Sequence, residues 1–174
     1  MSATAPAKPR ADEYAEYYGK YVSLVPEGDI VETLSKQSGE TLAMLRSIPE
    51  ERAGHAYGPG KWSIRQLVGH VIDTERIFAY RALAIARGER ASLPGMEQDE
   101  YMEHASFDGR TLESLCEEFS HVRRANVLMM SGFDADAWAR RGVASDNEVT
   151  VLALAHIIAG HELHHVNVLR ARYL

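Results

Sequence analysis

At 174 residues, with 45% hydrophobic and 25% charged residues, the chain has the size and composition of one globular domain. A net charge of −6 opposes a non-specific nucleic-acid surface, which needs clustered lysine and arginine, so no nucleic-acid partner is expected. No apolar run approaches the roughly 18 residues of a membrane span, and the single cysteine, Cys116, cannot form an internal disulfide. We therefore expect a cytoplasmic protein without a membrane partner.

The N-terminal residues differ in composition from the rest of the chain. Residues 1–10 are rich in Ala, Pro and Lys and lack the apolar core of a signal peptide. We therefore predict a flexible arm over residues 1–12 and a single domain over residues 13–174. The four tyrosines that follow, which are Tyr14, Tyr17, Tyr18 and Tyr21, are expected to serve in packing.

Helical periodicity first appears over residues 29–47, where apolar residues recur at three- and four-residue spacing after Asp29, a candidate N-cap. A connecting loop to Gly60 follows. A second helix is predicted over residues 63–87, because Ser63 and Gln66 have the spacing of a capping box and Gly88 is typical of a helix end.

Two more long helices are predicted after a long connection. Residues 92–108 contain Pro94 and Gly95 and have mixed polarity, with a short helix expected over residues 98–104. The third long helix should span residues 111–130, opened by Thr111, and the fourth residues 149–173. We see no convincing strand. The pattern predicts an all-α four-helix bundle with a long connection between its second and third helices.

The last helix carries His161 and His165, which share one face because they lie four residues apart. Their stripe is otherwise apolar, so it should face the bundle interior, and His70 lies on an apolar stripe of the second helix in the same way. Buried imidazoles need partners, and one metal ion can serve several rings at once. The sequence therefore predicts that His70, His161 and His165 hold a metal ion with open positions.

Other interpretations of these residues stay open at this point. A buried histidine such as His70 can also be a hydrogen-bonded core residue. His164 could replace one member of the pair but is expected at the edge of the site. His156 lies off the stripe, so it should be structural or support a ligand from behind. Gly69 and Gly160 each precede a candidate ligand, and glycine disfavours a helix interior, so we expect the two helices to approach closely there.

Residues 161–165 also match H-E-x-x-H, the zinc-peptidase motif, in which Glu162 would act as the general base. Such enzymes need a third ligand, which usually lies well downstream. The segment after His165 contains no His, Asp or Glu, and Val168 occupies the glycine position of the extended motif. A peptidase would therefore have to take its third ligand from upstream.

Three segments together resemble the DinB superfamily of YfiT-like, metal-dependent proteins. Residues 59–63 read Pro-Gly-Lys-Trp-Ser, residues 69–76 read Gly-His-Val-Ile-Asp-Thr-Glu-Arg, and residues 160–165 read Gly-His-Glu-Leu-His-His. The resemblance extends over nearly the whole chain from the first long helix onward. It implies a four-helix bundle, often a homodimer, in which His70, His161 and His165 hold a divalent metal ion.

The resemblance also implies a class of chemistry. The ion could be zinc, nickel, manganese or iron, and such an ion lowers the pKa of bound water or deprotonates a thiol. Some members of the superfamily are thiol-dependent transferases or isomerases that use bacillithiol or mycothiol, and others are regarded as hydrolases. Asp73 and Glu162 are candidates to orient the ligands by hydrogen bonds, whereas Cys116 is a poor nucleophile because no basic residue flanks it.

We therefore expect a metal-dependent enzyme, a transferase or a hydrolase, that acts on a small-molecule substrate. A low-molecular-weight thiol is a candidate cosubstrate. The alternative from another functional class is a non-catalytic, metal-binding stress-response bundle in which the ion stabilises the fold. A catalytic site would have a cavity beside the metal, whereas a structural site would be closed by a fourth protein ligand.

Overall fold

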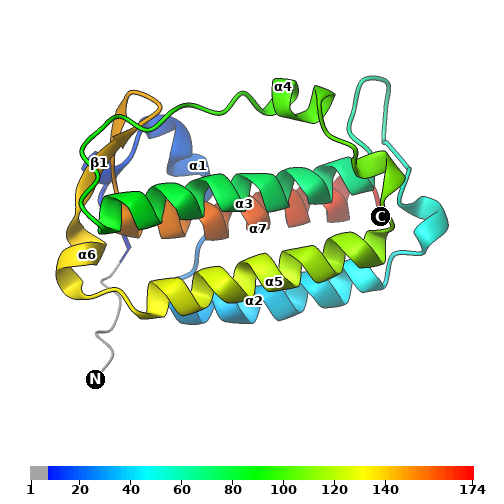
Figure 1. Cartoon of the computed structure of the whole chain (residues 1–174). Coiled ribbons are helices and arrows are strands. Elements are labelled where there is room, and N and C mark those ends of the chain that lie inside the picture. The colour runs from blue at the N-terminus through cyan, green and yellow to red at the C-terminus, as the bar shows by residue number, and fades with distance from the viewer. Residues whose placement is uncertain (1–7) are drawn as a thin grey trace.

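The computed structural model describes residues 8–174, and four long helices form its core (Figure 1). These helices are α2 (Ile30–Arg46), α3 (Ile64–Ala86), α5 (Leu112–Ser131) and α7 (Val151–Arg172). Helix α3 lies antiparallel to α7, and α2 lies antiparallel to α5, whereas α3 and α5 run in the same direction (Figure 1). Because α3 and α5 are parallel, the chain needs a long connection to return from the end of α3 to the start of α5. The predicted four-helix bundle with a long connection between its second and third helices is confirmed.

The long helices begin where capping chemistry predicts. The Asp29 carboxylate accepts the first backbone N–H groups of α2, and the Thr111 hydroxyl accepts one at the start of α5. Ser63 and Gln66 form the predicted capping box of α3, with distances of 2.9 and 3.2 Å. Helix α7 begins two residues later than predicted, because Thr150 is its N-cap.

Short elements join the long helices. They are η1 (Ala11–Glu13), η2 (Glu16–Tyr18), α1 (Gly19–Val22), η3 (Glu50–Arg52), α4 (Gln98–Glu103), η4 (Phe107–Gly109), α6 (Ala135–Ala139), β1 (Arg141–Ala144) and β2 (Asn147–Thr150). The short helix expected near residues 98–104 is present as α4. Residues 1–7 of the predicted arm lie outside the described residues. Residues 8–12 contact the domain, because Lys8 donates a hydrogen bond to the Val25 carbonyl and Asp12 pairs with Arg141.

The expectation that the chain contains no strand is wrong for residues 141–150, which form an antiparallel hairpin of β1 and β2. Ser145 and Asp146 at its turn have φ angles of 51° and 60°, the left-handed values that a type I′ turn requires. Each strand has four residues, and the turn lacks the glycine that marks most such turns. The backbone of Leu93 pairs with Val143 and Ser145, which ties the start of the long connection to the hairpin.

We call residues 93–107 the strap. The strap runs along the outer side of α3 and includes α4 (Figure 1). Its first residue, Leu93, is held by the hairpin, and its last, Phe107, packs its ring against Gly69 of α3. The strap therefore covers the part of α3 that carries His70.

Helix α7 is the most deeply buried helix of the bundle. All residues from 151 to 162 are buried, so this half of the helix is covered on every side rather than on the one stripe that the periodicity predicts. It packs against α3, α1 and α2. None of the helices within residues 8–174 combines the length and the apolar character that a membrane span requires.

Cys116 on α5 should be nearly inert in the native protein. Its side chain is 1% exposed, and burial raises the pKa of its thiol to about 11. At pH 8 only about one molecule in a thousand would then carry the reactive thiolate, against about a quarter for an ordinary cysteine. We expect iodoacetamide labelling, followed by mass spectrometry, to be at least about 100-fold slower in the native protein than in guanidinium. Equal rates in the two states would contradict this burial.

Candidate metal centre

His70 and the pair His161 and His165 reach one point from two antiparallel helices. The capping box at Ser63 fixes the start of α3 and places His70 about two turns along it. His161 and His165 lie one turn apart on α7. His70 and His161 are 3% and 6% exposed, and His165 is partly buried. The structure thus brings together the three histidines that the sequence analysis singles out.

The three imidazoles converge through the same ring nitrogen. The Nε2 atom of His161 lies 3.1 Å from Nε2 of His70 and 3.1 Å from Nε2 of His165. An imidazole nitrogen carries either one hydrogen or one lone pair, so Nε2 of His161 cannot form a good hydrogen bond with both neighbours. Hydrogen bonding among the rings alone therefore leaves the cluster incompletely satisfied.

Burial keeps these rings neutral at pH 7. It lowers the pKa of His70 to about 4 and that of His165 to about 3, and the pKa of His161 also lies well below its ordinary value. The nearby carboxylate of Asp99 opposes the shift of His70, and the neighbouring histidines reinforce the shifts of His161 and His165. Neutral imidazole is the form that binds metal ions, so no proton has to be displaced first.

The donor set fits a divalent ion. One ligand atom from each of the three histidines lies within 4.8 Å of the others. Tetrahedral zinc with metal–nitrogen bonds of about 2.0–2.1 Å places neighbouring ligand nitrogens about 3.3 Å apart, close to the 3.1 Å found here. Within residues 8–174, no fourth His, Cys, Asp or Glu joins the group. The arrangement therefore suits an ion that keeps open positions.

Aromatic rings surround the three histidines. The Trp62 ring lies 4.7 Å from the His70 ring, and the Tyr21 ring lies 5.3 Å from the His161 ring and 5.4 Å from the His164 ring. His164 is half-buried beside the cluster and is not one of the three converging residues. His156 is buried elsewhere, with Nδ1 at 3.0 Å from the Leu152 carbonyl, as expected for a structural residue.

Two clefts border the cluster. The first, of about 430 Å³, is lined by His70 and His161, and the second, of about 400 Å³, is lined by His165 and His164. Gln98 and Asp99, at the start of α4, line both clefts. An ion held by the three histidines would therefore be approached from two sides, with the strap between them.

Neither Asp73 nor Glu162 is placed as expected for a residue that orients a ligand. The side-chain oxygen of Thr74, at 3.5 Å, lies beside Nδ1 of His70, and Asp73 instead lines an open groove next to the end of α4. Burial raises the pKa of Asp73. Glu162 is 1% exposed and accepts hydrogen bonds from Gln37 at 2.6 Å and from Arg123 at 2.7 Å.

The placement of Glu162 also bears on the peptidase alternative. In that reading, the Glu162 carboxylate would have to activate water at the metal. Here it belongs to a buried ion network in which Arg123 of α5 also pairs with Glu75 of α3 at 2.7 and 2.8 Å. Arg123 additionally donates to the Leu34 carbonyl of α2 at 3.1 Å, so the network joins all four long helices. This arrangement opposes a peptidase, because the Glu162 carboxylate already pairs with Gln37 and Arg123 in the core of the bundle.

Sequence reasoning missed several residues that line the first cleft. The tyrosines expected to serve only in packing include Tyr17, Tyr18 and Tyr21, which form part of its wall. Arg81, about three turns beyond His70 on α3, lines it as well. The four-residue and seven-residue spacings that separate His70, Thr74 and Arg81 along α3 could have signalled a shared face, but nothing in the sequence marks that face as open.

Gly69 and Gly160 were expected to allow a close approach of α3 to α7, but each glycine instead lies against a different segment. A Cβ atom on Gly69 would lie 2.5 Å from the Phe107 ring of the strap, and one on Gly160 would lie 2.1 Å from the backbone oxygen of Tyr21 in α1. Gly69 therefore leaves room for the strap beside His70, and Gly160 leaves room for α1 beside His161. Neither serves the contact between the two long helices.

Gly160→Ala should displace α1 and destabilise the protein by about 3 kcal/mol, because the backbone of Tyr21 cannot yield as a flexible side chain can. Gly39→Ala is the matched control. Gly39 lies on an exposed part of α2 with open space around it, so alanine there should stabilise the helix by about 1 kcal/mol. Urea unfolding of both variants measures the difference. A Gly160→Ala variant as stable as wild type would show that α1 does not pack here.

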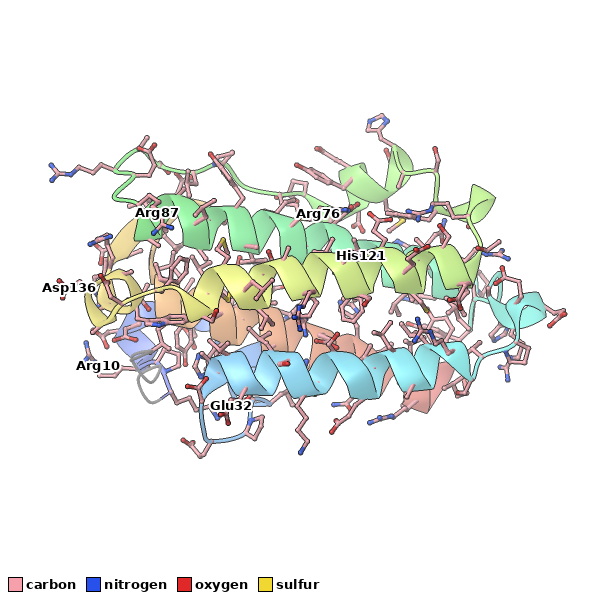
Figure 2. The ribbon with its side chains drawn as sticks, turned by 60° about the horizontal axis from the view of Figure 1, so that its bottom comes forward. Arg10, Glu32, Arg76, Arg87, His121 and Asp136 are labelled. Atoms are coloured by element: carbon pink, nitrogen blue, oxygen red, sulfur yellow. The ribbon has the colours of Figure 1, made fainter. Side chains whose placement is uncertain are left out.

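The remaining histidines are exposed, and they are His55, His104 and His121, of which His121 lies on the outer side of α5 (Figure 2). They take no part in the cluster of three.

Comparisons with known proteins agree with this architecture. A protein of Oceanobacillus iheyensis named as a candidate metal-dependent hydrolase is 30% identical over 71 residues, which are 41% of this chain and 39% of that protein. The chain thus aligns with about two-fifths of that relative's length.

Two solved structures share the fold at low sequence identity. YfiT from Bacillus subtilis, described as a probable metal-dependent hydrolase with an unusual four-helix bundle topology, has a TM-score of 0.67 and 14% identity, and the match covers 94% of this chain and 91% of that chain. A mycothiol-dependent maleylpyruvate isomerase has a TM-score of 0.63 and 13% identity, with 79% of this chain and 58% of that chain covered. A family model described as the DinB superfamily matches residues 33–169, and the chain therefore belongs to the DinB superfamily.

Proposed function

We propose that the protein is a metal-dependent enzyme that transfers a low-molecular-weight thiol to a small-molecule acceptor. The observation that carries this proposal is that two clefts, of about 430 and 400 Å³, are each lined by members of one cluster of three histidines. A transfer between two molecules needs access for both of them at the reacting point. Hydrolysis needs access for one molecule and water.

The three histidines have a defined role in this proposal. His70, His161 and His165 would hold a divalent ion, and as neutral ligands they would leave its full positive charge in place. When bound, such an ion supplies a thiolate from a coordinated thiol or a hydroxide from water. Zinc, nickel, manganese and iron are the candidates, because imidazole suits several of them and affinity alone does not select one.

The surrounding residues hold the rings of the cluster in place. Tyr21 packs its ring against His161, and Trp62 packs its ring against His70. Thr74 lies beside the second nitrogen of His70 and can fix the orientation of this ring. The imidazoles that border the two clefts are thus held by side chains that are themselves packed.

The open ligand set supports an enzyme over a bundle with a purely structural ion. A structural zinc site is closed by four protein ligands. Of the His, Cys, Asp and Glu residues in the described part of the chain, three make up this group. The relative named as a candidate metal-dependent hydrolase supports metal-dependent chemistry, and the solved structure of the same fold named as a mycothiol-dependent isomerase supports the use of a thiol.

The test is to load the protein with cobalt and titrate it with small thiols. We expect about one ion per chain and a thiolate-to-cobalt charge-transfer band when cysteamine or mercaptoethanol is added. A screen of electrophiles with and without thiol then separates transfer from hydrolysis, because a hydrolase turns over without thiol. Absence of bound metal after supply of zinc, nickel, manganese and iron would overturn the proposal. The homodimer implied by the family resemblance stays a prediction that analytical ultracentrifugation tests.

A further inference from the structure

Arg81 is a buried cation in the wall of the first cleft, and no carboxylate pairs with it. Its side chain is 3% exposed. Its Nη2 atom donates to the Pro94 carbonyl at 2.7 Å and to the Ser145 hydroxyl oxygen at 3.1 Å, and its Nε atom is buried without a hydrogen-bond partner. Throughout residues 8–174, no ion pair within 4 Å involves this guanidinium.

This arrangement is costly in the absence of an anion. A guanidinium is always charged in proteins, and a buried charge needs both a counter-charge and hydrogen bonds. The other deeply buried arginine of the bundle, Arg123, shows what a satisfied site looks like, because Glu75 and Glu162 both pair with it. Arg81 has only neutral acceptors and the face of the Phe78 ring, which lies 4.9 Å from its Cζ atom, and it lines a cleft of about 430 Å³. An anion can therefore reach it from solvent.

We propose that Arg81 binds a carboxylate of the small molecule that occupies the first cleft. The Ser145 hydroxyl provides a second donor, because its oxygen accepts from Arg81 and its hydrogen stays free to donate. Ser145 also lines this cleft. The structure therefore assigns two converging donors, one of them charged, to one anionic group.

The rim of the cleft restricts which anion fits. Glu97 and Asp99 line the cleft and are exposed. Two acidic side chains at the entrance repel polyanions such as polyphosphates more strongly than a single carboxylate. The preferred ligand therefore carries a single carboxylate at the end that reaches Arg81.

The position of Arg81 also restricts the shape of the ligand. Arg81 lies eleven residues after His70 on α3, a rise of about 16 Å along the helix axis, and helical side chains lean back toward the N-terminus. A molecule that reacts at the three histidines while its carboxylate contacts Arg81 must therefore be elongated. Reaction of the ligand's other end at the three histidines rests on the proposed function, whereas binding of its carboxylate to Arg81 does not require a metal.

The experiment compares ω-mercaptoalkanoic acids of three to eight carbons with mercaptoalcohols of the same length. Calorimetric titration into cobalt-loaded protein should show tighter binding of the acid by about tenfold or more at the best length, because the extra hydrogen bonds are charge-assisted. Arg81→Gln should abolish this preference and leave the affinity for the alcohol unchanged. Arg81→Lys should retain part of the preference. The control is Arg87→Gln, which replaces an exposed arginine at the end of α3 (Figure 2) and should change nothing.

A second pair of probes separates this proposal from the proposed function. Hexanoate and hexanol titrated into metal-free protein test the carboxylate site alone, and an Arg81-dependent preference for hexanoate supports it even if no metal binds. If Arg81→Gln does not fold, Ser145→Gly takes its place, because glycine tolerates the φ of 51° and lacks the hydroxyl donor. The preference for hexanoate over hexanol should then fall. Equal affinity of acid and alcohol for the wild-type protein, or a preference that survives Arg81→Gln, would overturn the proposal. Arg81 would then serve only to join the strap to the hairpin.

Discussion

His161→Ala should reduce bound metal from about one ion per chain to background and abolish turnover of any substrate found in the screen. His161 is the central member of the cluster, since its Nε2 atom lies 3.1 Å from both other ring nitrogens. Loss of a hydrogen-bond partner to a ligand costs about 10- to 100-fold in metal affinity, and loss of the ligand itself should cost more. Elemental analysis of the purified variant and zinc titration measure the change.

His164→Ala is the matched control for this variant. It removes a neighbouring imidazole on the same turn of α7 that is not one of the three converging rings. It should keep its metal. A thermal shift gives a second measurement, because zinc at 100 times its dissociation constant should stabilise the wild-type protein by about 2.7 kcal/mol and leave His161→Ala unchanged. If His164→Ala loses as much metal as His161→Ala, the ligand set is not the one assigned here.

Arg123→Ala should destabilise the protein by about 3–5 kcal/mol, the largest effect on stability that we expect from a single side chain. Burial lowers the pKa of Arg123, but Glu75 and Glu162 outweigh this effect, so that the guanidinium stays charged. Removing it leaves two carboxylates buried without their cation, at a point where hydrogen bonds reach all four long helices. Urea unfolding followed by circular dichroism measures the loss.

Arg124→Ala provides the control, because Arg124 is exposed on the same turn of α5 and should change stability by less than about 0.5 kcal/mol. A triple variant, Arg123→Met with Glu75→Gln and Glu162→Gln, should recover much of the loss, since it leaves no unpaired buried charge. If Arg123→Ala and Arg124→Ala are equally stable, the ion network does not hold the helices together.

The sequence predicted the features that depend on local chemistry. Caps and apolar spacing located the four long helices to within a few residues, because an N-cap such as Asp29 or Ser63 acts on the backbone next to it. The four-residue spacing of His161 and His165 placed both rings on one face. The antiparallel packing of α3 on α7 then brings His70 to them, which the family resemblance implied and the local pattern alone left open.

The features that were missed depend on contacts between distant residues. Arg123, Glu75 and Glu162 lie on three different helices, and charged residues are seldom buried, so no local pattern marks them as core residues. The hairpin was missed because its strands have four residues each and its turn uses Ser145 and Asp146 in place of glycine. The strap forms part of the wall of the cleft that Arg81 lines, and its position along α3 is a tertiary arrangement that helical periodicity does not encode.

The strap has a consequence for how such a protein could diversify. Its ends are fixed, Leu93 by the hairpin and Phe107 by the groove at Gly69, while Gln98 and Asp99 between them line both clefts and are exposed. Substitutions between these anchors can alter what the clefts accept without moving the helices that carry the histidines. Descendants of one ancestral bundle could therefore acquire different substrates by changes in about a dozen contiguous positions, while the ion site is inherited unchanged.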